Sequence, residues 1–130
     1  MLLIALAGGE AWLREGRRLP MAHDTRIDRI ALMAPAVGYF QAPHALDAVD
    51  VPVLAWAGSG DTVTPPSQAA YLARELDGRV PVDVRVVEGA GHFSFLHTLP
   101  PHIVDPLPDR EAFLARLTSD MCAFVLGQDS

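Results

Sequence analysis

The sequence predicts an α/β fold: a parallel sheet with flanking helices, containing three candidate strands. Apolar, β-branched segments alternate with segments of helical periodicity, and glycine-rich loops follow two of the apolar segments. Strands that alternate with crossover helices pair in parallel through right-handed connections. The length of 130 residues suits one domain and is too short for two.

The N-terminal part is expected to hold a helix, a polar loop and the first strand. Residues 1–13 place leucines at helical spacing, although no capping residue precedes their apolar first turn. Residues 14–25 are polar, and Arg26–Ala34 then forms a short apolar run that predicts a buried strand. Residues 35–50 contain two prolines and are expected to be a surface excursion with at most one short helix.

The densest apolar segments predict the second and third strands. Residues 51–57 (VPVLAWA) are continuously apolar, and residues 82–87 (VDVRVV) alternate between apolar and polar side chains. Between them, Thr64 before a proline is a candidate helix N-cap, and Gly78 is the expected end of that helix.

A final helix is expected after the proline-rich stretch 100–108. Asp109 can cap it, and Phe113, Leu117 and Met121 then recur at a spacing of three to four residues. Cys122 on this helix is predicted to be a buried thiol.

Composition excludes several classes of function. The net charge is −6, and the basic residues, all arginines, form no patch, so a nucleic-acid partner is not expected. One cysteine allows no internal disulfide and favours a reducing compartment. The apolar start is too short for a signal peptide or a membrane span, so we expect a cytoplasmic protein without a membrane partner.

Asp61 and His92 are the candidate catalytic residues. Each lies in a glycine-rich loop after a predicted strand, and the carboxyl ends of parallel strands share one rim of a sheet. An aspartate there can orient a histidine, which then removes a proton from a nucleophile. Taken singly, each has a local alternative: Asp61 completes a turn, and His92 is a polar residue beside an aromatic loop.

Two segments carry a resemblance to a known family. Residues 51–66 (VPVLAWAGSGDTVTPP) resemble the acid segment of α/β-hydrolases, and residues 89–96 (GAGHFSFL) resemble the histidine loop of the dienelactone-hydrolase-like branch. The order of acid before histidine agrees with that family. The resemblance runs from about Arg26 to Leu96, and the last helix of the family corresponds to the expected final helix.

The resemblance implies that residues 1–130 are a single partial domain, the C-terminal portion of an α/β-hydrolase fold without its nucleophile-bearing half. It implies hydrolysis of a small-molecule carboxylic ester or lactone, with Asp61 and His92 as two members of the catalytic triad. No cofactor and no metal are expected. Phe93 and Phe95 are candidates for substrate binding in an apolar pocket.

The sequence departs from the family in its nucleophile. No G-x-S-x-G elbow precedes Asp61, no serine occurs before Ser59, and Ser94 is too close to His92 in sequence to be its usual partner. The oxyanion-hole donors also lie upstream in the family. Two alternatives to an active hydrolase therefore stay open: a catalytically inactive, truncated hydrolase-like protein, or the partner-dependent half of a split hydrolase.

In a truncated fold the strand near Arg26–Ala34 would have an unpaired edge. Such an edge invites pairing with another chain, which is the protein partner expected here.

A metal site is a further alternative. Histidines 92, 97 and 102 recur every five residues with Asp105 nearby. A proline pair interrupts any helix that would align them, and no HExxH or CxxC pattern supports a metal, so we expect none.

Overall fold

A computed structural model describes residues 24–128. The helix predicted for residues 1–13 lies outside this range. The described elements, in chain order, are β1 (Ile30–Met33), the 3-10 helix η1 (Val37–Phe40), β2 (Val53–Gly58), α3 (Pro66–Leu76), β3 (Val82–Val87), the 3-10 helix η2 (His92–Phe95) and α4 (Arg110–Val125).

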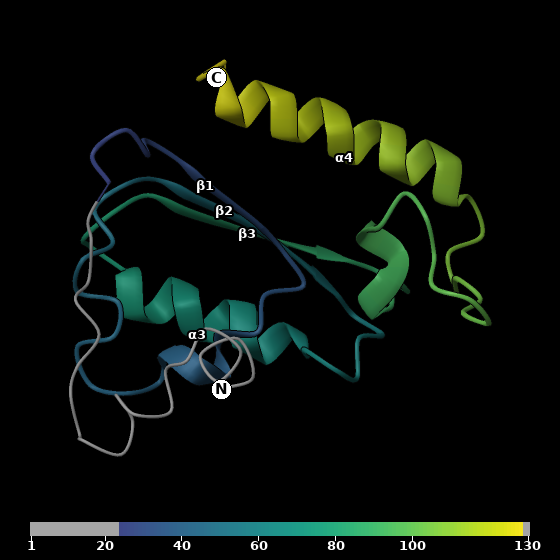
Figure 1. Cartoon of the computed structure of the whole chain (residues 1–130), viewed down its shortest axis with the longest axis horizontal. Coiled ribbons are helices and arrows are strands. Elements are labelled where there is room, and N and C mark those ends of the chain that lie inside the picture. Colours follow the sequence, from purple (N-terminus) through teal and green to yellow (C-terminus); the bar gives the residue numbers. More distant parts are fainter. Residues whose placement is uncertain (1–23, 129–130) are drawn as a thin grey trace, which may run out of the picture.

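The three strands form one parallel sheet with β2 in the centre (Figure 1). Ile30 of β1 is opposite Val53 of β2, and Val53 is in turn opposite Val82 of β3. The parallel sheet with flanking helices confirms the predicted fold class.

The central strand β2 is buried along its whole length, which explains its continuous apolar sequence. Its side chains alternate between the two faces of the sheet. Val53 joins a cluster with Leu72 and Leu76, whereas Leu54 and Trp56 join a second cluster on the opposite face.

The helices α3 and α4 cover opposite faces of the sheet (Figure 1). Helix α3 buries Ala69, Leu72 and Leu76, the face that its periodicity predicts. Helix α4 buries Phe113, Leu114, Leu117 and Phe124.

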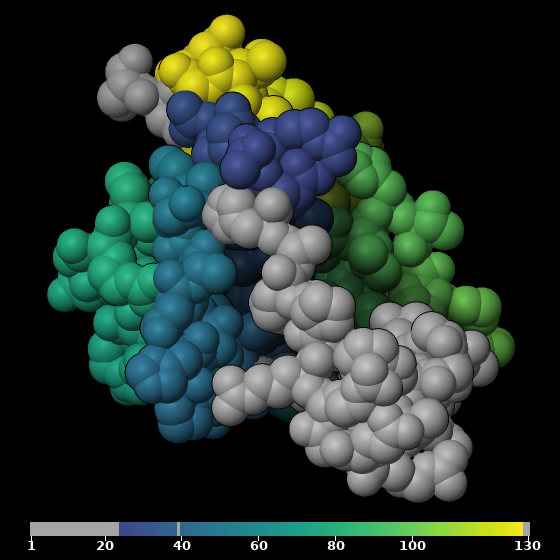
Figure 2. All heavy atoms as spheres, turned by 60° about the vertical axis from the view of Figure 1, so that its left-hand side comes forward, coloured from purple at the N-terminus to yellow at the C-terminus, as the bar shows by residue number. Residues whose placement is uncertain are grey.

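The C-terminal part of α4 lies beside the segment that leads into β1, as Figure 2 shows at the top of the molecule. The guanidinium group of Arg29 sits over the ring of Phe124 at 5.5 Å. This contact attaches the end of α4 to the edge strand.

Three details of the sequence-based prediction need correction. The first strand is shorter than Arg26–Ala34, because the carboxylate of Asp24 accepts from the amide and guanidinium of Arg26 and holds the chain in a turn. The residue before α3 is Pro65, with no side-chain cap, so Thr64 does not cap this helix. Cys122 is exposed, because α4 presents Phe113, Leu117 and Phe124 to the core and turns its thiol away from them.

Within the described residues, no helix has the length and apolar character needed to cross a membrane.

Candidate active site

The loops that follow β2 and β3 are joined to each other by hydrogen bonds. The amide of Ser59 donates to Val87 O at 3.0 Å, and the amide of Gly60 donates to Ala90 O at 3.0 Å. The hydroxyl of Ser59 accepts from the amide of Gly89 at 2.9 Å. The two loops are therefore held as one unit at the carboxyl edge of the sheet.

This close contact between the two loops requires glycine at position 58. A Cβ atom on Gly58 would lie 2.2 Å from the carbonyl oxygen of Ala90, far inside contact distance. The glycines before Asp61 thus serve a close approach between two backbones as well as a turn.

The structure brings Asp61 and His92 together. Nδ1 of His92 lies 2.9 Å from Oδ2 of Asp61. The Asp61 side chain is fully buried, whereas 27% of the His92 side chain is exposed. The pair thus has a buried carboxylate behind an imidazole that reaches solvent.

The Asp61 carboxylate is surrounded by hydrogen-bond donors. Oδ1 accepts from the amides of Val63 and Thr64, each at 2.8 Å. Burial by itself would raise the pKa of Asp61, but hydrogen bonds from the Thr64 amide, His92, the Thr64 hydroxyl and the Val63 amide outweigh it and lower the pKa. Asp61 is therefore a carboxylate at neutral pH, which favours the tautomer of His92 that carries its proton on Nδ1.

Thr64 is a member of this site that the sequence analysis assigned to a helix cap. Its hydroxyl lies 2.9 Å from Oδ2 of Asp61, 3.0 Å from Nδ1 of His92 and 3.0 Å from the carbonyl oxygen of Ala34. A hydroxyl has one proton to donate and can also accept, so Thr64 can donate to Asp61 or Ala34 while it accepts from Nδ1–H. Ala34 directly follows β1, so the hydroxyl connects the ends of all three strands.

In the sequence, the only indication that Thr64 belongs to the site is its position three residues after Asp61. An aspartate accepts readily from backbone amides two and three residues ahead, and this spacing fits Asp61, Val63 and Thr64. The contact of the Thr64 hydroxyl with His92 has no such local signature.

The two candidate substrate-binding aromatics lie in different surroundings. Phe93 is partly exposed, and its ring meets that of His92 edge-on, with centroids 5.1 Å apart. Phe95 is only 5% exposed and packs edge-to-face on Phe113 of α4, with centroids 5.7 Å apart.

None of the serines in residues 24–128, nor Cys122, is hydrogen-bonded to His92. The Ser59 hydroxyl accepts from Gly89, and the Ser94 hydroxyl donates to Asp105 at 2.9 Å. Nε2 of His92 has no hydrogen-bond partner among the same residues. An imidazole held by a buried carboxylate, with Nε2 unoccupied by these residues, has the geometry in which a histidine can act as a general base.

The other histidines of residues 24–128 do not gather around a common point. His97 and His102 are exposed, and the described part of the chain contains no group of three or more side chains placed to hold a metal ion.

Comparisons with known proteins give partial matches. Pimeloyl-(acyl-carrier protein) methyl ester esterases from Neisseria meningitidis serogroup C and serogroup B are each 47% identical to this chain over 55 residues, which is 42% of this chain and 20% of the relative. The chain thus spans about a fifth of the length of these curated relatives. No protein-family model matches the chain, and no solved structure matches it. The esterase matches support the α/β-hydrolase superfamily.

Proposed function

We propose that this chain is the acid- and histidine-bearing part of a carboxylic ester hydrolase of the α/β-hydrolase type. The distance of 2.9 Å between Nδ1 of His92 and Oδ2 of the buried Asp61 carries the proposal. Similarity to proteins named methyl ester esterases supports ester hydrolysis as the family-level activity.

In the proposed reaction, Nε2 of His92 takes the proton of a nucleophile as that nucleophile attacks the carbonyl carbon of the substrate. The imidazolium that forms is stabilised by the Asp61 carboxylate and then gives its proton to the departing alkoxide. Water attacks the acyl intermediate, again with His92 as base, and releases the acid. The nucleophile and the oxyanion donors belong to a segment beyond the described residues or to a second chain.

The substrate proposed is a small-molecule ester or lactone. The histidine loop GAGHFSFL favours the dienelactone-hydrolase-like branch and hence lactones, whereas the names of the relatives favour simple esters. Phe93, beside the imidazole, is placed to contact such a substrate, and Phe95 supports it from the core. We propose a cytoplasmic location for this activity.

The edge of β1 favours a second proposal, that the chain is the partner-dependent half of a split hydrolase. The amide of Ile30 donates to Pro52 O, directly before β2, and the amide of Ala34 donates to Trp56 O of β2. The amide of Met33, one residue before Ala34, therefore points to the opposite side. Among residues 24–128 no strand pairs with this side of β1, which can therefore receive a further strand. Sedimentation velocity checks this proposal: a species larger than the 14.0 kDa chain supports it, and a monomer contradicts it.

Activity tests the principal proposal. Tagged protein is purified from its own cells with whatever chains accompany it, and hydrolysis of p-nitrophenyl butyrate is measured. We expect kcat to fall about 100-fold or more in His92→Gln and Asp61→Asn, the usual range for loss of a general base. His97→Gln, an exposed histidine five residues further on, is the matched control. Hydrolysis that is absent, or that is unchanged in His92→Gln, contradicts the proposal.

A further inference from the structure

We propose that the ion pair between Asp105 and Arg110, acting through Ser94, is the positioning element that holds His92 at hydrogen-bond distance from Asp61. This inference rests on the proposed function and adds positioning residues to it. It arises from a hydrogen-bond network that joins the histidine loop to Asp105 and to the first residue of α4.

The first part of the network closes around His92 itself. The hydroxyl of Ser94 accepts from the amide of Gly91 at 3.0 Å and donates to Oδ1 of Asp105 at 2.9 Å. Gly91 and Ser94 stand on either side of His92 in the chain, and Ser94 is 1% exposed. The turn that carries the imidazole is therefore fastened from within the protein.

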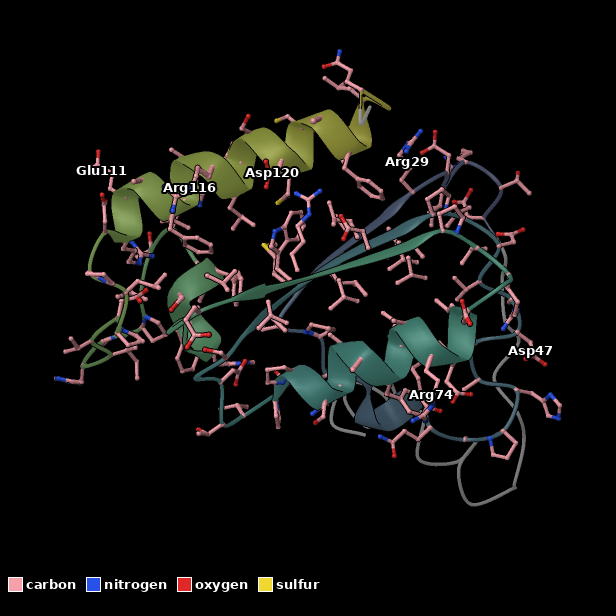
Figure 3. All side chains as sticks on the ribbon, turned by 180° about the vertical axis from the view of Figure 1, so that it is seen from behind. Arg29, Asp47, Arg74, Glu111, Arg116 and Asp120 are labelled. Carbon is pink, nitrogen blue, oxygen red and sulfur yellow. The ribbon has the colours of Figure 1, made fainter. Side chains whose placement is uncertain are left out.

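The second part fastens that turn to α4. Oδ1 of Asp105 also accepts from the amide of Leu107 at 2.9 Å, and Oδ2 accepts from Nε of Arg110 at 2.9 Å. The Arg110 guanidinium donates in addition to the carbonyl oxygen of Leu96, the residue after η2. Arg110 is the first residue of α4, next to Glu111, which Figure 3 labels in the first turn. One arginine thus holds both the carboxylate and the end of the histidine loop.

This ion pair is less exposed than those on the surface, and its carboxylate is almost completely covered. The side chains of Asp105 and Arg110 are 6% and 23% exposed. A buried carboxylate needs a charged partner and donors for its oxygens, and both oxygens of Asp105 have them. Such a pair fixes geometry because a displaced partner would leave a charge uncompensated.

The histidine loop needs this external support. Helix η2 has only four residues, and the hydrogen bonds at its two ends run from Ser94 N to Gly91 O at 3.2 Å and from Leu96 N to Phe93 O at 3.1 Å. Short 3-10 helices have poorer hydrogen-bond geometry than α-helices and do not by themselves fix a side chain to the tolerance that proton transfer requires. The Ser94–Asp105–Arg110 network supplies the missing constraint.

A second ion pair on α4 provides a matched control. Arg85 of β3 donates to Asp120 at 2.8 Å, and these side chains are 42% and 45% exposed. Asp120, labelled midway along α4 in Figure 3, attaches the same helix to the sheet without touching the histidine loop. Asp120→Asn removes the charge of this pair and so weakens an attachment of α4, while it leaves the proposed element intact.

The test is NMR of the full chain labelled with ¹⁵N-histidine, which reads the imidazole directly and needs neither ester nor nucleophile. A hydrogen-bonded Nδ1 proton of His92 should appear downfield and exchange slowly in the unmodified chain and in Asp120→Asn. We expect its exchange to be at least 10-fold faster in Ser94→Ala and Arg110→Gln, and Arg110→Lys to restore part of the protection. Protection of the Trp56 backbone amide in β2, read from a second sample that is uniformly labelled with ¹⁵N, verifies that each variant is folded.

The outcomes separate this inference from the proposed function. An unchanged Nδ1 proton in both Ser94→Ala and Arg110→Gln overturns it, and so does equal acceleration in Asp120→Asn, which would mark a general loosening of α4. Absence of the slow proton from the unmodified chain overturns it as well. Lack of ester hydrolysis would contradict the proposed function while leaving this readout intact.

Discussion

Replacing Gly58 with alanine should damage both the sheet and the candidate site. Gly58 is the last residue of β2, opposite Val87 of β3. A Cβ at this position would lie 2.2 Å from the carbonyl oxygen and 2.8 Å from the carbonyl carbon of Ala90, whereas ordinary contacts begin at 3.4 Å. The obstructing atoms are backbone, so no side chain can rotate away, and Ala90 itself is fully buried.

The expected loss of stability follows from the contacts that the backbone of Ala90 loses when it moves away from the added Cβ. Its retreat stretches the bond from the Gly60 amide, now 3.0 Å. Overpacking costs about 1–3 kcal/mol and a lost hydrogen bond about 0.5–1.5 kcal/mol, while alanine returns roughly 0.4–1 kcal/mol by restricting the unfolded chain. The midpoints of these ranges give a net loss of about 2 kcal/mol, or a fall in Tm of roughly 10 °C for a domain of this size.

Thermal unfolding followed by circular dichroism measures this loss, and two glycines give matched controls. A Cβ on Gly38 meets nothing within 4 Å, and one on Gly91, directly before His92, meets Pro106 at an ordinary 3.5 Å. Both alanine variants should remain within about 1 kcal/mol of the unmodified protein. If Gly58→Ala melts within about 2 °C of Gly38→Ala, the close approach of the two loops is not a structural constraint and the reasoning fails.

Three further predictions concern the acid and the core. Thr64→Val keeps the shape of the side chain but removes the hydroxyl that bonds to Asp61 and Ala34, so the free energy of unfolding should fall by about 1–3 kcal/mol. The pKa of Asp61 should rise, because one of the hydrogen bonds that lower it is lost, and a ¹³C NMR titration of the carboxyl group measures this rise. The pKa of Asp61 is below 3.8 in the folded chain, so its ionised form contributes stability that is fully present above about pH 4 and is lost as the pH falls through the folded pKa. The free energy of unfolding in urea should therefore differ less between pH 7 and pH 3 for Asp61→Asn than for the unmodified protein. An equal or larger difference would contradict the predicted direction of this pH dependence. Leu54→Ala should cost about 2–5 kcal/mol in the same urea assay, because Leu54 is 1% exposed between the sheet and α4, and a loss below about 1 kcal/mol would refute that packing.

The bounds of the helices and strands were predictable from the sequence where the burial of apolar side chains alone determines them. The strand over residues 82–87 was predicted with its observed bounds, and β2 is displaced by only a residue or two from residues 51–57. The start of β1 was less accurate, because the local bonds from Arg26 to Asp24 compete with strand pairing and no periodicity reveals them. Asp109 caps α4 as predicted, with its side chain accepting from the amide of Ala112 at 3.0 Å.

The candidate site was predictable where topology alone brings residues together. Parallel strands direct their following loops to one edge, and this was enough to place Asp61 near His92. The roles of Thr64 and Asp105 were not accessible, because they depend on contacts across the fold: the Thr64 hydroxyl reaches Ala34, thirty residues away in sequence. A threonine before a proline has an equally good local explanation as a helix cap, and only the tertiary structure decides between the two.

The register of the sheet is what makes an acid–histidine pair of these two residues. Asp61 lies three residues past the end of β2 and His92 five residues past the end of β3, so their separation depends on the pairing of Gly58 with Val87. A slip of one residue would displace one loop by about 3.3 Å along the strand. Such a shift would break the hydrogen bond between Asp61 and His92, which is 2.9 Å long. The bonds that resist this slip, from Ser59 to Val87 and from Gly60 to Ala90, lie between the strands and the two side chains. Geometry at the site and cohesion of the sheet are therefore set by the same contacts, and a substitution that loosens one loosens the other.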